Sequence, residues 1–277
     1  MFIHNLNPTI FSIGPLSVQW YGLVYALGFL FAYWYLNRAA KNNKIRLSQE
    51  GVDTYVFRLI LLSIIGARLV YVFVYNPGHY LANPLDVFAL WQGGLSFHGG
   101  LLGAAIATYW TQKTHGVRFY SIADLLVIPF AIVLFFGRVA NFINAELIGH
   151  PTSVSWCVVF PGYEECRHPA QLYEGIKNLF VAGVLATLVS IDSVKSRLRA
   201  GTIFWLFVLL YGLGRFLTDF TRVADPTDPL VGGILLGQWL SLAMVLVATT
   251  FLVYIHVFDK TTHKNPVKNK KNKHKKR

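Results

Sequence analysis

The chain has few charged residues. Asp, Glu, Lys and Arg make up 14% of its 277 residues, whereas a soluble domain carries about a quarter. Hydrophobic residues make up 54% of the sequence and gather in long runs. This composition excludes an ordinary soluble globular protein. It predicts an all-α polytopic membrane protein.

Positive charge is missing from alternate segments of the chain. Two Lys or Arg residues in total occur in residues 1–12, 76–98, 145–170 and 221–233. In contrast, 18 occur in residues 37–51, 112–120, 192–200 and 259–277. Because cytoplasmic loops carry the excess of Lys and Arg, this alternation predicts a periplasmic N-terminus and a cytoplasmic C-terminus.

The length and the hydrophobic runs allow roughly seven transmembrane helices. We predict these helices at residues 14–36, 52–75, 99–112, 121–144, 171–190, 201–220 and 234–258. The third is short and rich in glycine, so we expect it to be tilted, broken or partly re-entrant. Because no Lys or Arg precedes the first run, the order of a signal peptide is reversed, and we predict an uncleaved first span.

The helices form one predicted transmembrane domain, residues 1–258, followed by a basic cytoplasmic tail, residues 259–277. This tail holds nine Lys or Arg residues, and no aromatic residue follows Phe258. Without aromatic side chains it offers no stacking surface for single-stranded nucleic acid. We interpret the tail as a disordered anchor attracted to anionic membrane lipids, and we expect no nucleic-acid partner.

Cysteine is scarce as well. Cys157 and Cys166 both lie in the predicted periplasmic segment 145–170. A disulfide between them and a pair of free thiols are both consistent with that compartment. No second Cys/His pair stands at a spacing that would complete a metal site, so we expect no metal.

A polar sequence follows the apolar run 125–136. Arg138, Asn141 and Asn144 follow at i,i+3 steps, so they share roughly one face if the run is helical. A charged side chain at membrane depth costs about 3 kcal/mol, so it is rarely placed there for packing alone. This stretch therefore predicts a site that handles a charged headgroup.

The predicted topology brings more polar residues to the same outer end of the bundle. These are Tyr21, Arg68, His98, Glu174, Tyr211, Arg215 and Asp219. We expect one polar cavity in the outer leaflet, in which Arg138 and Arg215 bind an anion.

Several polar side chains near the outer end of the bundle also have a simpler interpretation. Arg68 is equally consistent with a structural ion pair to Glu174 or Asp219. Lys177 and Arg222 are interpreted as snorkelling to the interface. Tyr residues near helix ends are usually interfacial.

His98 stands between two glycine pairs, Gly93-Gly94 and Gly99-Gly100. Glycine allows positive φ and lets backbone N–H groups approach an anion. A histidine there can exchange a proton near neutral pH, although a packed loop histidine is an equally good interpretation.

Taken together, these residues match a known pattern. The most specific part is Gly137-Arg138-x-x-Asn141-Phe142-Ile143-Asn144-x-Glu146-x-x-Gly149. The supporting motifs are Gln19-Trp20-Tyr21-Gly22, Gly66-Ala67-Arg68, His98-Gly99-Gly100-Leu101, His168-Pro169-x-Gln171-Leu172-Tyr173-Glu174 and Tyr211-Gly212-x-x-Arg215-Phe216. With these motifs, the chain resembles the bacterial prolipoprotein diacylglyceryl transferases over nearly its whole length.

The resemblance implies a multi-pass enzyme of the bacterial inner membrane. It would transfer the diacylglyceryl group of phosphatidylglycerol to the lipobox cysteine of a preprolipoprotein, forming a thioether and releasing glycerol 1-phosphate. No metal or cofactor is implied.

On this basis we predict His98, Arg138 and Arg215 as catalytic residues. Both arginines would hold the phosphate, and His98 is the candidate base for the thiol. The predicted substrate-binding residues are Tyr21, Arg68, Asn141, Asn144, Glu146, Glu174, Tyr211 and Asp219. Asp219 stands where the family usually has Glu, which leaves its contact with Arg215 or Arg68 in doubt.

The main alternative is a small-solute or lipid transporter, because charged residues within membranes also mark transport paths. A transporter of this kind commonly contains internal repeats and a midplane site. The sequence has no evident repeat, and its ionisable groups gather at one face.

Overall fold

The computed structural model describes residues 1–14, 16–195, 197–224 and 230–258. The predicted basic tail, residues 259–277, lies outside the described residues.

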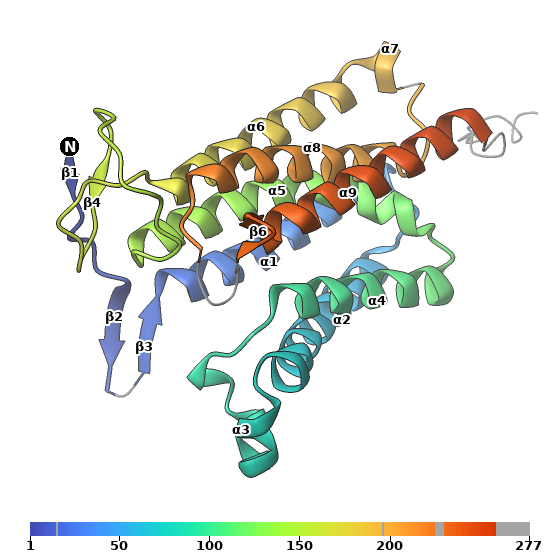
Figure 1. Cartoon of the computed structure of the whole chain (residues 1–277). Helices are drawn as coiled ribbons and strands as arrows, with labels where there is room; N and C mark the ends of the chain where they lie inside the picture. The colour runs from blue at the N-terminus through green and yellow to red at the C-terminus, as the bar shows by residue number, and fades with distance from the viewer. Residues whose placement is uncertain (15, 196, 225–229, 259–277) are drawn as a thin grey trace, which may run out of the picture.

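The described chain is mostly helical (Figure 1). Its long helices are α1 (Trp20–Lys41), α2 (Gln49–Val70), α4 (Phe97–His115), α5 (Phe119–Ile143), α6 (Ala170–Ser190), α8 (Thr202–Thr218) and α9 (Leu236–Val253). The shorter helices are α3 (Pro77–Ala82), α7 (Asp192–Lys195), the π-helical η1 (Tyr71–Tyr75) and η5 (Tyr254–Phe258), and the 3-10 turns η2 (Pro84–Phe88), η3 (Leu90–Gln92) and η4 (Asp219–Thr221).

The described residues also form three small two-stranded sheets. They pair β1 (Phe2–Ile3) with β4 (Val158–Val159) in parallel, and β2 (Thr9–Ile13) with β3 (Leu16–Gln19) and β5 (Leu230–Val231) with β6 (Ile234–Leu235) in antiparallel.

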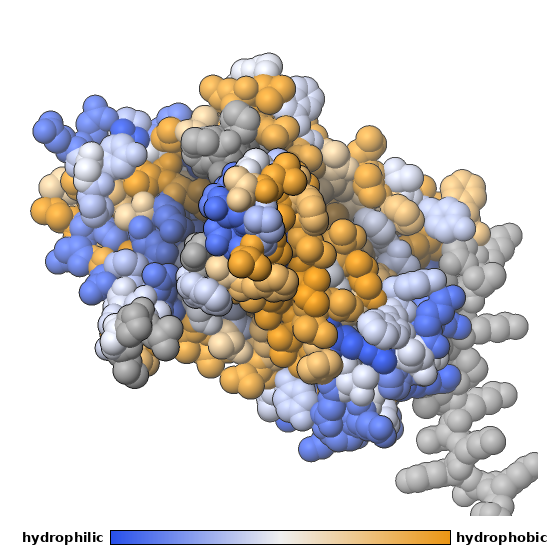
Figure 2. Space-filling view, turned by 90° about the horizontal axis from the view of Figure 1, so that it is seen from below, coloured by the Kyte–Doolittle hydropathy of each residue, from blue (hydrophilic) through white to orange (hydrophobic). Residues whose placement is uncertain are grey.

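Five of the described helical segments are long and apolar enough to cross a membrane. They are Gln49–Tyr75, Phe119–Ile143, Ala170–Ser190, Thr202–Thr221 and Leu236–Phe258. This confirms the predicted class, a helical multi-pass membrane protein. Figure 2 shows the matching surface: hydrophobic side chains cover the middle of the face, and hydrophilic ones gather toward its two ends.

The first predicted helix, residues 14–36, is wrong at both ends. Helix α1 begins only at Trp20, because Thr9–Ile13 and Leu16–Gln19 pair as the strands β2 and β3. The helix continues to Lys41. Gly14 supplies the positive φ of 58° that the tight turn between the two strands requires. The apolar run predicted as one helix therefore contains both a strand and the beginning of a helix, and hydrophobicity alone does not distinguish the two.

The third predicted helix is longer than expected and continuous. The Ser96 hydroxyl accepts a hydrogen bond from Gly99 N at 3.3 Å and caps the start of α4, while Gly116, with a φ of 65°, ends it. Helix α4 packs closely on α2. A Cβ at Gly99 or Gly103 would overlap the backbone of α2 at Gly66 or Leu62. The glycines thus bring two helix backbones together rather than breaking the helix.

The helices form two groups, with α2, α3 and α4 beneath a larger bundle of α1, α5, α6, α8 and α9 (Figure 1). One buried hydrophobic cluster joins α1, α2, α4 and the start of α5. A second joins α5, α6 and α8. Because α5 contributes to both clusters, it connects the two groups of helices.

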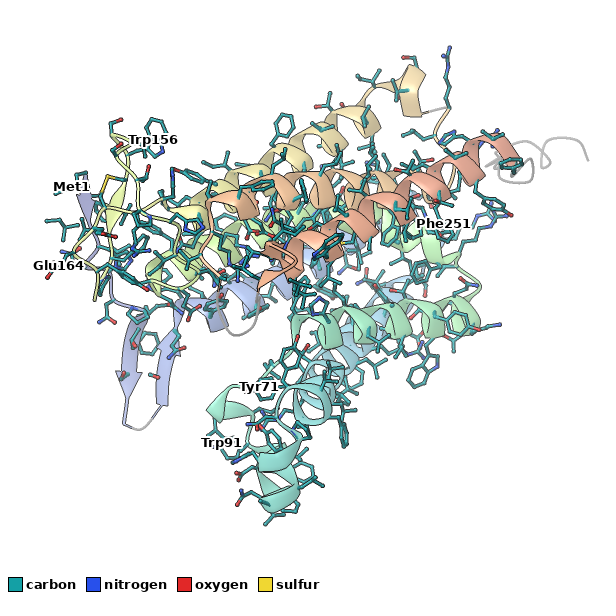
Figure 3. The ribbon with its side chains drawn as sticks, in the orientation of Figure 1. Met1, Tyr71, Trp91, Trp156, Glu164 and Phe251 are labelled. Carbon is teal, nitrogen blue, oxygen red and sulfur yellow. A yellow bond between two sulfur atoms is a disulfide. The ribbon has the colours of Figure 1, made fainter. Side chains whose placement is uncertain are left out.

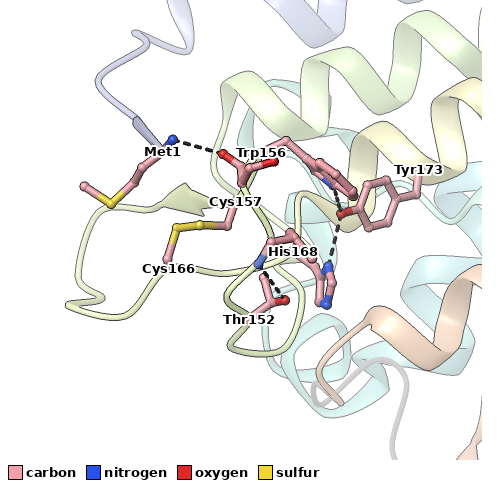
Figure 4. The surroundings of a disulfide bond; sticks show 9 residues. Met1, Thr152, Trp156, Cys157, Cys166, His168 and Tyr173 are labelled. Carbon is pink, nitrogen blue, oxygen red and sulfur yellow. Dashed lines mark hydrogen bonds between the residues drawn. A yellow bond between two sulfur atoms is a disulfide. The ribbon is translucent and has the colours of Figure 1, made fainter.

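A disulfide joins Cys157 to Cys166 in the loop between α5 and α6 (Figure 4). Of the two states consistent with the sequence, the structure contains the bonded one. At the end of the same loop, the Tyr173 hydroxyl is within 3.0 Å of His168 Nδ1 and accepts a hydrogen bond from Trp156 Nε1 at 2.8 Å. The Met1 ammonium also reaches this loop, where it donates to Ser155 O at 3.1 Å. These contacts anchor the start of α6.

Candidate active site

Arg138 lies near the end of α5 and points toward α6. Its Nε is 2.5 Å from Glu174 Oε2, and its Nη1 donates to Asn141 Oδ1 at 3.1 Å. Its Nη2 makes no hydrogen bond to any described residue, and 18% of the side chain is exposed. The guanidinium is therefore held on one side and accessible on the other.

Glu174 joins two arginines from different helices. Its Oε1 accepts a hydrogen bond from Arg215 Nη1 on α8 at 3.0 Å, while Oε2 faces Arg138. Arg215 Nε also lies 3.4 Å from Asp219 Oδ2. Glu174 is 5% exposed and Asp219 2%. Buried carboxylates of this kind need charged partners, and here they hold two guanidinium groups close together.

Asn141 extends this network toward α1. Its Nδ2 donates to the Tyr21 hydroxyl and to Glu146 Oε2, the latter at 3.0 Å. Asn144 Nδ2 donates to the other oxygen of Glu146 at 3.3 Å. Eight predicted site residues are thus connected by hydrogen bonds and ion pairs, namely Tyr21, Arg138, Asn141, Asn144, Glu146, Glu174, Arg215 and Asp219.

The turn after α5 directs Glu146 back toward the helix. Ala145 and Leu147, on either side of it, both have a φ of 55°, which is uncommon for residues other than glycine. The backbone carbonyl of Glu146 accepts a hydrogen bond from Gln171 Nε2, and Gln171 is 1% exposed. The local strain is therefore supported by a buried amide from α6.

Tyr211 contacts Lys177, a residue for which the sequence suggested a different role. Lys177 Nζ lies 3.9 Å from the centroid of the Tyr211 ring and is buried. The interpretation of Lys177 as a snorkelling residue is therefore wrong. Both Lys177 and Gln171 lie three residues from Glu174 in sequence, so the i,i+3 spacing on α6 was the signal that could have identified them.

Arg68 does not form the predicted ion pair with Glu174 or Asp219 and instead binds backbone carbonyls. Its Nε donates to Val87 O at 2.9 Å, and Nη1 and Nη2 donate to four further carbonyls, those of Gly93, Gly94, Asp86 and Ala89. All five N–H groups are used, so Arg68 organises loop 86–94. This loop belongs to the lower group of helices, where Figure 3 labels Tyr71 and Trp91. A direct contact between Arg68 and substrate stays a prediction.

His98 lies in the exposed first turn of α4, and its ring packs edge-on against Phe97. It makes no hydrogen bond or ion pair with the described residues of the arginine network. Gly93 and Gly94 have the expected positive φ values of 81° and 75°, whereas Gly99 is helical and is used for packing on α2. The structure therefore shows no direct contact between His98 and the arginines, and its role as a base stays a prediction.

An apolar cavity of about 440 Å³ lies between α1 and α5. Its lining includes Trp20, Val139 and Ala140, which are direct sequence neighbours of network residues, and it continues along the helices to Gly28 and Val133. The volume is in the range of ligand pockets. A hydrophobic chain in this cavity would thus have its polar end near Tyr21 and Arg138.

Comparison with known proteins identifies the family of this chain. The sequence profile of a family described as prolipoprotein diacylglyceryl transferase matches residues 8–254. The phosphatidylglycerol–prolipoprotein diacylglyceryl transferase of Geobacter sulfurreducens is 39% identical over 253 residues, covering 91% of this chain and 96% of the relative. Proteins of the same name from Vibrio campbellii and Vibrio cholerae are each 40% identical, and the matches cover 91% and 90% of this chain and 92% of either relative. The chain therefore belongs to the prolipoprotein diacylglyceryl transferase family.

Proposed function

We propose that this chain transfers the diacylglyceryl group of phosphatidylglycerol to the lipobox cysteine thiol of a preprolipoprotein. The observation that carries this proposal is the convergence of Arg138 and Arg215 on Glu174 beside an apolar cavity. Such a site pairs an anion-binding end with a space for acyl chains. The names of the relatives specify the same lipid and acceptor for those proteins.

The proposed location is the bacterial inner membrane, crossed seven times with the N-terminus in the periplasm. The described parts of the basic segments 37–51, 112–120 and 192–200 gather at one end of the molecule, which supports this orientation. Ile45 and Val117, from two of these segments, belong to one buried cluster, and Arg199 donates to the Ile255 carbonyl at the end of α9. The arginine network lies toward the opposite end, so the reaction would occur at the outer leaflet.

The reaction forms a sulfur–carbon bond and breaks the bond between the glyceryl carbon and a phosphate oxygen. The thiol loses its proton, and glycerol 1-phosphate leaves with one more negative charge than the diester carried. Arg138 Nη2 and Arg215 are proposed to stabilise this growing charge. Glu174 would keep the two guanidinium groups together.

The other residues are proposed to position the two substrates. Tyr21, Asn141, Asn144 and Glu146 supply hydroxyl, amide and carboxylate groups suited to the glycerol hydroxyls. The acyl chains would occupy the cavity between α1 and α5. His98, exposed at the start of α4, remains the candidate acceptor for the thiol proton.

The test is a reconstituted assay with the purified chain, phosphatidylglycerol and a peptide that contains a lipobox cysteine. Mass spectrometry should detect the diacylglyceryl thioether, with one glycerol 1-phosphate released for each peptide modified. Arg138→Gln or Arg215→Gln should lower kcat/KM by about 10²–10³-fold, because each removes a charged donor from the transition state.

Arg58→Gln serves as the matched control. Arg58 hydrogen-bonds Thr114 at 2.8 Å and packs over Trp110, away from the network, so its loss should leave kcat/KM nearly unchanged. A wild-type chain that forms no thioether but moves a solute across liposomes would refute the proposal and favour a transporter.

A further inference from the structure

Lys177 carries a buried ammonium group that the network does not use. Its Nζ is inaccessible to solvent and has no hydrogen-bond partner among the described residues. The group does face one aromatic ring, at 3.9 Å from the centroid of Tyr211. That contact leaves its N–H donors without an acceptor.

The neighbouring helix makes room for this side chain. A Cβ at Gly214 on α8 would overlap the Cγ and Cδ of Lys177. Glycine is an unfavourable residue within a helix. Helix α8 nevertheless has one at the position where the aliphatic part of the Lys177 side chain passes. The stem is thereby held between α6 and α8 with its charged end at Tyr211.

The nearest carboxylates are already engaged. Glu174, three residues before Lys177 on α6, uses one oxygen for Arg138 and the other for Arg215. Asp219 faces Arg215 Nε at 3.4 Å. Both carboxylates thus face arginines, and neither accepts a hydrogen bond from Lys177.

A buried ammonium without an acceptor is costly, and an anion bound beside it would offset that cost. A phosphate suits the place because several of its oxygens can accept hydrogen bonds from different helices at once. Lysine binds phosphate as a point charge, so it needs no fixed orientation.

We infer that Lys177 is a third cationic contact for the phosphate group of a glycerol phosphate ester, alongside Arg138 and Arg215. The same chemistry occurs in intact phosphatidylglycerol and in free glycerol 1-phosphate. This inference rests on the proposed function and adds to it a residue that holds the headgroup.

The test compares wild type with Lys177→Met, which keeps an unbranched side chain, shorter by one atom, and removes its charge. The matched control is Lys113→Met. Lys113 Nζ also faces a tyrosine, at 5.4 Å from the centroid of Tyr109, but Lys113 is exposed and lies in the last turn of α4. We would measure KM for phosphatidylglycerol, the inhibition constant of glycerol 1-phosphate, and the thermal midpoint in detergent.

Lys177→Met should raise KM and the inhibition constant by about tenfold to a hundredfold, as expected for losing a hydrogen bond to a charged group. Its thermal midpoint should stay equal or rise, since an unpaired buried charge is removed. A rise in KM alone would assign the contact to the lipid headgroup, and a rise in the inhibition constant alone would assign it to the released phosphate.

Constants within twofold of wild type would overturn the inference, and a lower thermal midpoint in that case would assign Lys177 a packing role only. If wild type itself transfers nothing, the proposed function fails separately. Equilibrium binding then decides the matter: Lys177→Met should weaken binding of phosphatidylglycerol but not of diacylglycerol, and equal weakening or none would refute the inference.

Discussion

Glu174→Gln tests the centre of the site. The substitution keeps the size of the side chain and removes the charge that holds Arg138 and Arg215 at 2.5 and 3.0 Å. Two guanidinium groups would then face each other in a buried environment with their shared counter-charge removed. We therefore expect a loss of stability together with a loss of activity.

The magnitude follows from the burial of this carboxylate, which is 5% exposed. Removing one partner of a buried ion pair costs about 3–5 kcal/mol, because the remaining charge is left uncompensated. For a chain of this size, each kcal/mol lowers the thermal midpoint by about 2–4 °C. Glu174→Gln should therefore lower that midpoint by roughly 6–20 °C.

The measurement is thermal unfolding of the detergent-solubilised protein, paired with the thioether assay below the midpoint of the variant. Glu165→Gln is the matched control. Glu165 also faces an arginine, Arg167, but at 3.6 Å and with 66% of its side chain exposed. Exposed pairs contribute about 0–1 kcal/mol, so this control should shift the midpoint by a few degrees at most.

One result would refute the reasoning. If Glu174→Gln and Glu165→Gln have the same midpoint, and both transfer the diacylglyceryl group at the wild-type rate, then Glu174 does not organise the two arginines. The proposed phosphate site would need a different arrangement.

Two further predictions concern the ends of the bundle. Gly149→Ala should greatly reduce folding yield and transfer, because a Cβ there would overlap the His168 carbonyl at 2.5 Å; detergent-soluble, active protein at wild-type yield would contradict this. Asp124→Ala should cost about 1–2 kcal/mol, since its carboxylate accepts hydrogen bonds from Gly201 N at 2.7 Å and Phe204 N at 2.8 Å and thereby caps α8. Transfer by Asp124→Ala at low temperature should match wild type, and an unchanged thermal midpoint would contradict the capping role.

Most of the network could be predicted because its members are close in sequence or share one end of the bundle. Arg138 and Asn141 are three residues apart on the same helix, and the hydrogen bond between them forms as this i,i+3 spacing predicts. Arg215 and Asp219 are four residues apart, and they face each other although Asp219 is shorter than the usual Glu. Such contacts depend on helix geometry alone.

Contacts between distant helices were less predictable. The sequence left Arg68 with Glu174 or Asp219 as candidate partners, whereas the carbonyls of loop 86–94 take all its donors. Lys177 resembled an interfacial lysine, yet its Nζ is buried against α8. The sequence shows on which face of a helix a side chain lies, but which neighbouring element packs against that face depends on the rest of the protein.

The sequence alone determined the membrane class, the approximate positions of the long helices and the group of polar residues at one end. Hydrophobic runs and charge distribution are local properties, and the cost of burying charge in lipid limits where each segment can lie. Tertiary structure alone decided that Glu174 joins two arginines, and that Lys177 Nζ is buried without an acceptor among the described residues. These features depend on the rotation and spacing of whole helices, which are set by distant contacts such as the close packing of Gly99 on Gly66.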